Sequence, residues 1–337
     1  GNYVLPRGTI LIPFHSFAAF NVGHLMWDDM LPIYSLLQSF GMLPSSGSRS
    51  NQQLMPIRYK LKHPLWATCD FTNVTQANCE QNFKKLLPLI GVDTRVFRSF
   101  NESMIYTSKG SKAKSRYVCS PQGAAGLGML NDHGLKKHGY EREDYEYSQN
   151  VGKSQIFRGF RNYMMENIGM DPTKRASSKP PHTITVSLNS TVDEFRNVTF
   201  DKQIKAIEAL AKEQKLLKRE ITLRTVIFKD YTIEEQIRMV TESAVLIGVC
   251  GGGAVTNMFL SDGAGMVLYY PDNITTLPYH KFPSRLDWDY FNNAGNARVH
   301  WLPISSMDDE DDLNLLKALV LSEVDTVIEY NRINQEF

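Results

Sequence analysis

The C-terminal half of the chain alternates between two hydrophobic periods. Short apolar or alternating runs, which are typical of strands, cover residues 182–188, 221–228, 244–249 and 266–270. Segments with helical spacing lie between them, at residues 201–214, 233–241 and 254–260. Strands that alternate with helices at this pitch predict a parallel sheet with helices on both faces.

The N-terminal half is less regular. Residues 9–13 (TILIP) predict a short buried strand, and residues 21–40 predict a helix that ends at Gly41. Because Pro32 lies inside this helical pattern, we expect a kink or a break there. A further helix is predicted at residues 83–90. Polar or small-residue segments predict loops at residues 44–53, 108–114, 123–128 and 131–155.

The length of the chain and a linker-like segment predict two lobes. The chain has 337 residues, more than one typical core holds. The stretch at residues 174–181 (KRASSKPP) has the composition of an interdomain linker. A terminal helix is predicted at residues 313–330, after the acidic stretch at residues 308–312.

Composition excludes several classes of function. Hydrophobic residues make up 42% of the chain and charged residues 22%, as in ordinary globular proteins. The net charge of +1 argues against nonspecific nucleic-acid binding, which needs a strong positive field. No apolar run reaches the roughly 18 to 20 residues that span a bilayer. Since the sequence opens with Gly1 and not Met, a signal or membrane anchor is expected upstream.

Sequons and cysteines favour the secretory pathway. The chain carries five Asn-x-Ser/Thr sequons, at Asn73, Asn101, Asn189, Asn197 and Asn273. Cys69 and Cys79 flank the first sequon, where a disulfide would close a short loop, and their spacing does not match a CxxC metal site. Four unrelated thiols, with Cys119 and Cys250, are the alternative expected of a cytosolic enzyme.

Three glycines, Gly251, Gly252 and Gly253, directly follow the apolar run at residues 244–249 and open a predicted helix. Such a turn presents unpaired backbone N–H groups at the positive end of a helix dipole, and glycine lets a phosphate approach them. The sequence therefore predicts a diphosphate cradle, with a tight packing turn as the alternative. It is neither a GxGxxG fingerprint nor a P-loop, which weakens dehydrogenase and kinase interpretations.

His24 and Asp28 are spaced i and i+4, so they share one face of the first predicted helix. A carboxylate there could deprotonate an attacking hydroxyl, and the histidine could orient it or tune its pKa. The alternative is a packed histidine beside a favourable N-terminal acid. In the second half, Arg196 lies in a loop before a predicted helix, where a guanidinium could bind phosphate oxygens.

These blocks together resemble glycosyltransferase family 61. The Asn-x-x-His-x-x-x-Asp-x-x-x-Pro pattern of that family is matched by Asn21, His24, Asp28 and Pro32. The double acid Asp28-Asp29 is most similar to the branch that contains the protein O-linked mannose β-1,4-N-acetylglucosaminyltransferase. Residues 243–264 resemble the family's strand, its His-Gly-Ala turn and its Leu-Thr-Asn helix, and Arg196 falls where the family has an arginine. The resemblance extends over about residues 9–305, with little to match between 45 and 175.

The resemblance implies an α/β protein of the GT-B fold, with two Rossmann-like lobes facing a central cleft. Residues 1–177 would bind the acceptor, residues 178–307 the nucleotide sugar, and residues 308–337 would form a helix packing back on the N-terminal lobe. It also implies an inverting enzyme of the Golgi or endoplasmic reticulum lumen, with a type II membrane anchor. Expected partners are a nucleotide-sugar donor and a glycan or glycoprotein acceptor.

The implied mechanism is a one-step displacement with no metal and no cofactor besides the donor. Asp28 would take the acceptor proton, with His24 and Asp29 holding the geometry. UDP would leave, stabilised by the donor-site residues, which are Arg196, Gly251, Gly252, Gly253, Thr256 and Asn257. Trp27 and Tyr231 could stack on sugar or uracil. Branch similarity favours UDP-N-acetylglucosamine, while UDP-xylose and UDP-arabinose stay open.

Departures from the family pattern support rival interpretations. Cys250 replaces the turn histidine, Gly252 the following alanine, and Leu188 an arginine. These changes favour a catalytically degenerate glycan-binding protein, which the retained His24 and Asp28 oppose. A cytosolic α/β enzyme acting on a phosphorylated small molecule is a further alternative. The stretch Asp287-Trp288-Asp289 has the letters of a metal-binding Asp-x-Asp motif and keeps a metal-dependent reaction open.

Overall fold

The structure is a computed structural model of the chain. It describes residues 3–4, 7–14, 16, 18–44, 53–58, 69, 71–92, 118–125, 145–146, 148, 150–173, 181–188, 198–216, 220–272 and 282–334. The chain divides into two compact units. Unit 1 holds residues 1–133 and 162–171, and unit 2 holds residues 134–161 and 172–337.

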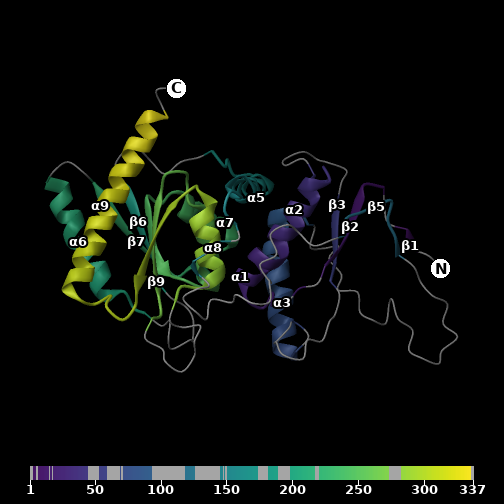
Figure 1. Cartoon of the computed structure of the whole chain (residues 1–337), viewed down its shortest axis with the longest axis horizontal. Helices are drawn as coiled ribbons and strands as arrows, with labels where there is room; N and C mark the ends of the chain where they lie inside the picture. Colours follow the sequence, from purple (N-terminus) through teal and green to yellow (C-terminus); the bar gives the residue numbers. More distant parts are fainter. Residues whose placement is uncertain are drawn as a thin grey trace. The chain divides into compact units, whose positions relative to one another are not determined.

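Unit 2 is built on a five-stranded parallel sheet in the order β10-β9-β8-β6-β7. Its strands are β6 (His182–Ser187), β7 (Ile221–Val226), β8 (Val245–Val249), β9 (Gly265–Tyr270) and β10 (Arg298–Pro303). Numbered along this unit, the order is 2-1-3-4-5 from the β7 edge. This is the doubly wound order, in which successive strands are added first on one side of β6 and then on the other. Helices α6 (Asp201–Leu216) and α9 (Glu310–Ile333) cover one face, and α7 (Ile233–Thr241) and α8 (Arg285–Ala294) the other (Figure 1).

The apolar runs explain why the sheet lies in the core. Val186, Ile247 and Leu268, on three adjacent strands, are all 0% exposed. Strands buried on both faces read as continuous apolar runs, which is how β8 was predicted. Helix α7 begins with a capping box, in which the Thr232 side chain accepts from the amide of Glu235 and the Glu235 carboxylate accepts from the amide of Thr232.

The structure corrects several predicted elements of unit 2. The helix expected at residues 254–260 is the 3-10 helix η6 (Gly252–Phe259), and a second 3-10 turn, η5 (Phe228–Asp230), follows β7. Helix α8 and strand β10 were not predicted. Strand β10 lies at the sheet edge, where five of its six residues are only partly buried, so its sequence RVHWLP lacks an apolar run. Its missing hydrophobic pattern is a consequence of this edge position.

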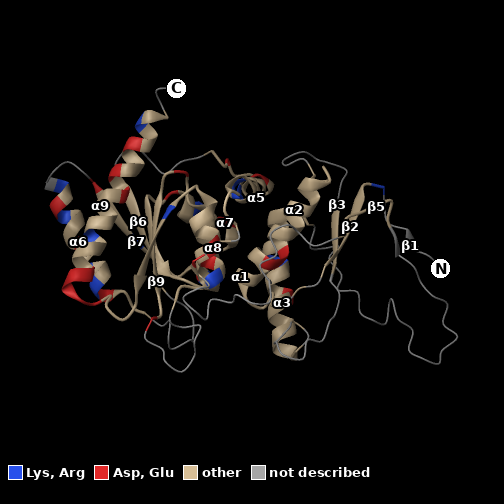
Figure 2. Ribbon diagram, in the orientation of Figure 1, with Lys and Arg blue, Asp and Glu red and all other residues tan. Residues whose placement is uncertain are grey.

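Helix α9 packs on unit 2, which corrects the expectation that it returns to the N-terminal lobe. It contacts α6 and strands β8 and β9. Its buried Glu323 accepts hydrogen bonds from Arg298 and pairs with His300, both on β10. Charged side chains gather along α6 and α9, while the strands beneath them carry few (Figure 2). The sequence of α9 does not show which unit the helix packs on, because an amphipathic helix could cover either sheet. The contacts of Glu323 with Arg298 and His300 decide it, and they depend on the fold.

Unit 1 carries a three-stranded parallel sheet in the order β3-β2-β5 and a two-stranded parallel pair, β1-β4. These strands are β1 (Tyr3–Val4), β2 (Thr9–Phe14), β3 (Gln53–Arg58), β4 (Val118–Cys119) and β5 (Gln122–Gly123). The strand predicted at residues 9–13 is confirmed as the central strand β2. Strand β3 was missed because Pro56 interrupts its sequence, which an edge strand tolerates.

The helix predicted at residues 21–40 is present in three consecutive pieces: α1 (Val22–His24), the π-helix η1 (Leu25–Met30) and α2 (Leu31–Ser39). Pro32 lacks an N–H for the carbonyl four residues earlier, and its ring crowds that carbonyl. The π-helix ends two residues before this proline, so the kink or break expected at Pro32 takes the form of a widened turn. Gly41 ends the segment with φ 62°, as predicted.

Two more helices belong wholly or partly to unit 1. Helix α3 (Asn73–Leu86) continues into the 3-10 helix η2 (Leu87–Ile90), so the helix predicted at residues 83–90 starts ten residues earlier than expected. The first residues of α3 are mostly polar and give little periodic signal. Helix α5 (Ser154–Asn167) was not predicted, and it contributes residues to both units. Cys69 and Cys79 form a disulfide, with Cα atoms 5.9 Å apart.

The prediction of an α/β fold with two Rossmann-like lobes is confirmed by the parallel sheets and the helices of the two units. The expected boundary near residue 177 is replaced by a division in which residues 134–161 belong with the C-terminal unit. Among the helices of the described ranges, none combines the length and the apolar character needed to cross a membrane.

Candidate functional site

The glycine turn follows the C-terminal end of β8, next to β6 in the sheet. Between the parallel strands β6 and β8, the order in which strands are added to the sheet reverses, so this is the topological switch point. In open parallel sheets, ligands bind beyond the carboxyl ends of the strands at this switch point. The position expected for a ligand in unit 2 is therefore the one that the three glycines occupy.

Gly251 gives the turn its shape. Its backbone has φ 122° and ψ −169°, a region essentially restricted to glycine. Its amide donates to Oδ2 of Asp287 at 2.5 Å, and Asp287 is 2% exposed. The first amide of the turn is thus bound to a buried carboxylate of α8. Gly251 therefore sets the shape of the turn, and its own N–H is engaged inside unit 2.

The next two amides have no such bond. Within the described residues, neither Gly252 nor Gly253 donates its N–H to a protein acceptor, whereas Ala254 donates to the carbonyl of Gly251 at 2.8 Å. Gly253 is exposed, and a Cβ added there meets nothing within 4 Å. Among the described residues, the first turn of η6 therefore has two N–H groups without a protein acceptor, next to free space. An anion that binds at a helix N-terminus uses such N–H groups.

Thr256 and Asn257 lie in the same 3-10 helix and are 4% and 2% exposed. Residues three apart eclipse each other in this kind of helix, so Thr256 lies below Gly253. The Oγ1 atom of Thr256 is buried and has no hydrogen-bond partner in the part of the chain that the structure describes. A buried hydroxyl without a partner is uncommon in proteins. Thr256 is thus a polar group one turn beneath the open position.

Other donor-site predictions have separate outcomes. Arg196 lies outside the described residues. Leu188 directly follows β6 and donates its amide to the carbonyl of Val226 at 2.8 Å. Tyr231 comes after the carboxyl end of β7, and the glycine turn comes after the carboxyl end of β8. Tyr231 is 42% exposed, so its aromatic ring is available to a ligand. Cys250 is 2% exposed and not disulfide-bonded, so the residue that replaces the family's turn histidine offers little surface to a ligand.

In unit 1 the structure brings His24 and Asp28 together. Nδ1 of His24 lies 2.6 Å from Oδ2 of Asp28. The Asp28 side chain is 2% exposed and the His24 side chain 32% exposed. With Nδ1 donating to the carboxylate, Nε2 of a neutral imidazole is left as a proton acceptor. The histidine is therefore the member of the pair that solvent reaches. Their approach across a π turn fits the frequent use of π-bulges at functional sites.

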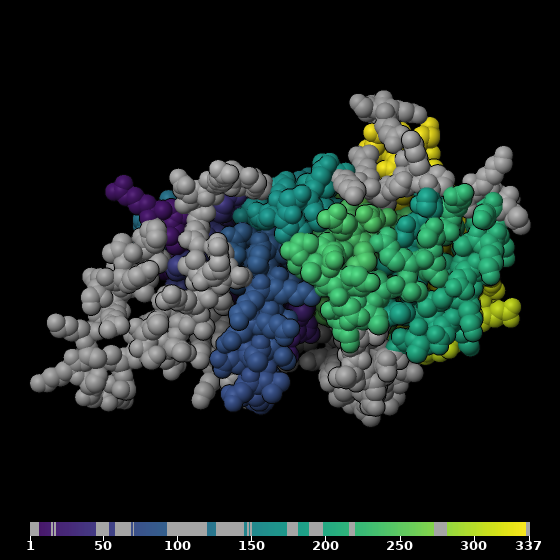
Figure 3. Space-filling model, turned by 180° about the vertical axis from the view of Figure 1, so that it is seen from behind, coloured from purple at the N-terminus to yellow at the C-terminus, as the bar shows by residue number. Residues whose placement is uncertain are grey.

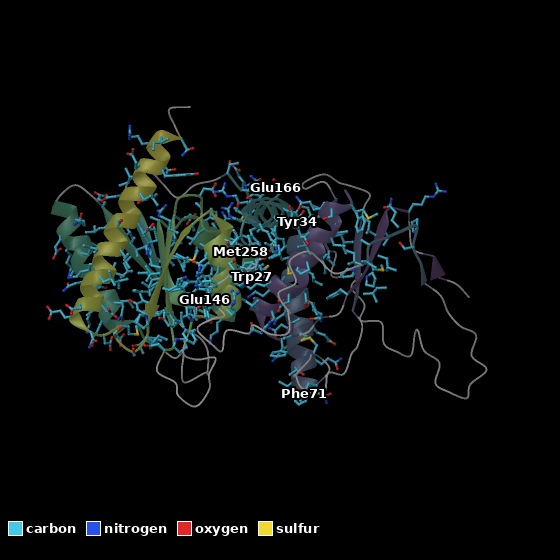
Figure 4. The ribbon with its side chains drawn as sticks, viewed as in Figure 1. Trp27, Tyr34, Phe71, Glu146, Glu166 and Met258 are labelled. Atoms are coloured by element: carbon cyan, nitrogen blue, oxygen red, sulfur yellow. A yellow bond between two sulfur atoms is a disulfide. The ribbon has the colours of Figure 1, made fainter. Side chains whose placement is uncertain are left out.

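Asp29 and Trp27 occupy different surroundings. Asp29 is 3% exposed, and its Oδ2 accepts from Oγ of Ser16 at 2.5 Å. Trp27 is 2% exposed, labelled in Figure 4, so its ring is packed rather than presented to a ligand. Sequence adjacency to Asp28 therefore does not give these residues the same environment as the His24–Asp28 pair.

The Asp-x-Asp stretch is used internally. Asp287 accepts from the Gly251 amide, and Asp289, which is 0% exposed, accepts from Nδ2 of Asn150 at 2.5 Å and from Ser148. Arg285 lies 3.6 Å from the same carboxylate. Both carboxylates are buried and accept hydrogen bonds from groups of unit 2, so their oxygens are already engaged and are not presented to a metal ion. Within the described ranges, no cluster of three His, Cys, Asp or Glu side chains could hold a metal ion.

The role of Asp287 was not predicted from the sequence. It lies 36 residues after Gly251, beyond a strand and a loop, and only the fold brings the two together. The only local signal is the pair of acids in the Asp287-Trp288-Asp289 stretch, whose spacing also fits a metal-binding motif.

No model of a known protein family matches the chain, and no curated protein is similar to it in sequence. Among solved structures, it is similar to a glycosyl transferase family 9 protein from Veillonella parvula DSM 2008. The two are 9% identical, over 97% of this chain and 98% of the other, with a TM-score of 0.34. A likeness at this level leaves function to the chemistry of the site.

Proposed function

We propose that this chain is a glycosyltransferase that moves a sugar from a nucleoside diphosphate donor to a hydroxyl of a glycan or glycoprotein. Unit 2 holds the donor and unit 1 supplies the base. The reaction is a single displacement with inversion at the anomeric carbon, and the leaving diphosphate is stabilised by protein donors without a metal.

The observation that carries the proposal is the open glycine turn at the switch point of the unit 2 sheet. The amides of Gly252 and Gly253 have no acceptor among the described residues, and the space beside Gly253 is free. Preorganised N–H groups of this kind stabilise negative charge as it develops on a leaving group. Arg196 and the hydroxyl of Thr256 would complete this set of donors.

The burial of the His24–Asp28 pair revises the catalytic roles that the sequence suggests. Because the Asp28 side chain is only 2% exposed, His24 is the better candidate to meet an acceptor hydroxyl. In this mechanism Nε2 of His24 takes the hydroxyl proton while Asp28 holds Nδ1–H and stabilises the imidazolium, as in other His–Asp pairs. The oxygen attacks the anomeric carbon, and the nucleoside diphosphate leaves.

The finer assignments rest on the resemblance to family 61. We propose membership of that family, a UDP-linked donor with N-acetylglucosamine as the first choice, and a location in the Golgi or endoplasmic reticulum lumen behind a type II anchor. UDP-xylose and UDP-arabinose are the alternative donors. The buried Cys69–Cys79 disulfide supports an oxidising compartment.

The rival is a glycan-binding protein of the same fold without catalysis, which the Cys250 and Leu188 departures favour. The test is a thermal-shift panel of UDP, GDP, CMP and their sugars, with and without EDTA. A ligand present at a hundredfold excess over its Kd stabilises the folded state by about 2.7 kcal/mol. A shift specific to UDP compounds and insensitive to EDTA supports the proposal. The absence of a shift with every nucleotide rejects it and favours the glycan-binding protein.

A further inference from the structure

The segment before α3 holds a rigid, exposed sequon. The sequence Phe71-Thr72-Asn73-Val74-Thr75 contains the acceptor pattern Asn-x-Thr. Thr72 and Thr75 form a capping box, with the Thr75 amide donating to Thr72 Oγ1 at 3.0 Å and the Thr72 amide to Thr75 Oγ1 at 2.9 Å. The Cys69–Cys79 disulfide ties the same segment to α3. The backbone on either side of Asn73 is thereby held in one conformation.

Large apolar side chains flank this asparagine in water. Phe71 is 66% exposed and Val74 is 69% exposed, and Asn73 between them is also exposed. Phe71, labelled in Figure 4, lies two residues before the first residue of α3, and the segment that holds α3 forms part of the surface seen in Figure 3. Exposed apolar groups that gather at one place mark a surface that another molecule covers.

The backbone places the aromatic ring and the amide on one side. Thr72 has φ −138° and ψ 164°, an extended conformation. Side chains on either side of an extended residue project to the same side of the chain. Phe71 and Asn73 therefore point the same way, two residues apart, so that a group joined to Asn73 lies within reach of the Phe71 ring.

We propose that Asn73 is N-glycosylated and that the first N-acetylglucosamine packs its apolar face on Phe71. Nδ2 of Asn73 forms a bond to C1 of the sugar, and the bond between C1 and a lipid-linked diphosphate breaks. The lipid diphosphate is the leaving group, and the amide proton passes to the transferring enzyme. The sugar then covers the ring and the Val74 side chain, which would otherwise stay in water. This site requires passage through the secretory lumen and is independent of the transferase proposal.

The test is secretion of the chain from animal cells, followed by enzymatic removal of N-glycans in ¹⁸O water and peptide mapping. Occupancy converts Asn73 to ¹⁸O-labelled Asp. The unfolding midpoint is then compared before and after deglycosylation, in the wild type and in Phe71→Ala, with Asn73→Gln as the unglycosylated control. Phe71→Ala removes an exposed side chain, so the variant is expected to fold.

The shift that deglycosylation produces in Asn73→Gln measures the glycans of the other sequons and is the reference. Beyond that shift, deglycosylation is expected to lower the wild-type midpoint by about 1–3 °C and the Phe71→Ala midpoint by almost nothing, because the packing partner is missing there. An unlabelled Asn73 in the secreted protein overturns the modification site. Equal shifts in the wild type and in Phe71→Ala overturn the packing of the sugar on the ring.

Discussion

The amide nitrogen of Gly251 lies 2.5 Å from Oδ2 of Asp287, so a buried carboxylate of α8 fixes the turn that ends β8. At φ 122° and ψ −169°, any side chain at residue 251 is strained. We expect Gly251→Ala to lower the free energy of unfolding by about 1–3 kcal/mol, the cost of a backbone held in a glycine-only region. Urea denaturation measures it. An unchanged free energy of unfolding would show that the turn relaxes freely.

The Asp287 carboxylate gives a second prediction at the same contact. Asp287→Ala leaves the buried Gly251 amide without its acceptor, at a cost of about 1–3 kcal/mol. Asp287→Asn keeps an acceptor oxygen and is expected to retain most of that stability. Denaturation of both variants provides the comparison. Equal losses in the two variants would mean that the carboxylate's charge, and not its hydrogen bond to Gly251, holds the turn.

For the His24–Asp28 pair, we expect both His24→Ala and Asp28→Asn to lower kcat by about 10²–10⁴, the usual contribution of general base catalysis. The double variant is expected to be little slower than His24→Ala, since the two residues act as one unit. Asp29→Asn is the comparison, because Asp29 bonds Ser16 and is expected to affect stability more than kcat. Additive losses in the double variant would contradict the pair.

The regular part of the fold was predictable because its signal is local. The runs at 182–188 and 244–249 predicted β6 and β8, and the i,i+4 spacing predicted the approach of His24 and Asp28. What distinguishes the members of that pair is their burial, 32% against 2% exposed, which depends on how the π turn packs. The contact between Gly251 and Asp287 joins residues 36 positions apart, and no local pattern encodes it.

The ionised Glu323 carboxylate stabilises the folded state, so we expect the protein to lose part of its free energy of unfolding in acid. Burial acts to raise the pKa of this carboxyl, but hydrogen bonds and charges from His300 and Arg298 outweigh burial and hold it below its usual value. A carboxyl with a lowered pKa gives its full stabilisation above the unfolded-state pKa, about 4.3, and loses that contribution as pH falls from there through the lower folded-state pKa. Glu323→Gln is therefore expected to be less stable than the wild type at neutral pH, by about 1–3 kcal/mol.

The difference should begin to narrow near pH 4.3, where the carboxyl of the unfolded chain takes up its proton, and should close as pH falls through the lower pKa of the folded state. Urea denaturation of both proteins at neutral and acidic pH measures it. A gap between wild type and variant that stays constant over this range would contradict the pairing of Glu323 with Arg298 and His300.

The Cys69–Cys79 disulfide closes a loop with a sequence separation of 10. Restricting the unfolded chain over such a loop stabilises the native state by about 2–3 kcal/mol in the chain-entropy model. We expect the double variant Cys69→Ser, Cys79→Ser to lose about this amount in urea denaturation. Reduction of the wild type with dithiothreitol should produce the same loss. Equal stability of the oxidised and reduced wild type would contradict the assignment.

The central claim is that the open amides of Gly252 and Gly253 bind the donor's diphosphate, and calorimetric titration with UDP tests it most directly. A methyl group at residue 253 meets no protein atom within 4 Å, so Gly253→Ala should keep its unfolding midpoint. The methyl would occupy the space through which a phosphate approaches the amides. The account predicts that UDP binds the wild type and that Gly253→Ala weakens binding by about tenfold or more. Equal affinity in both proteins, or no UDP binding by the wild type, would contradict it.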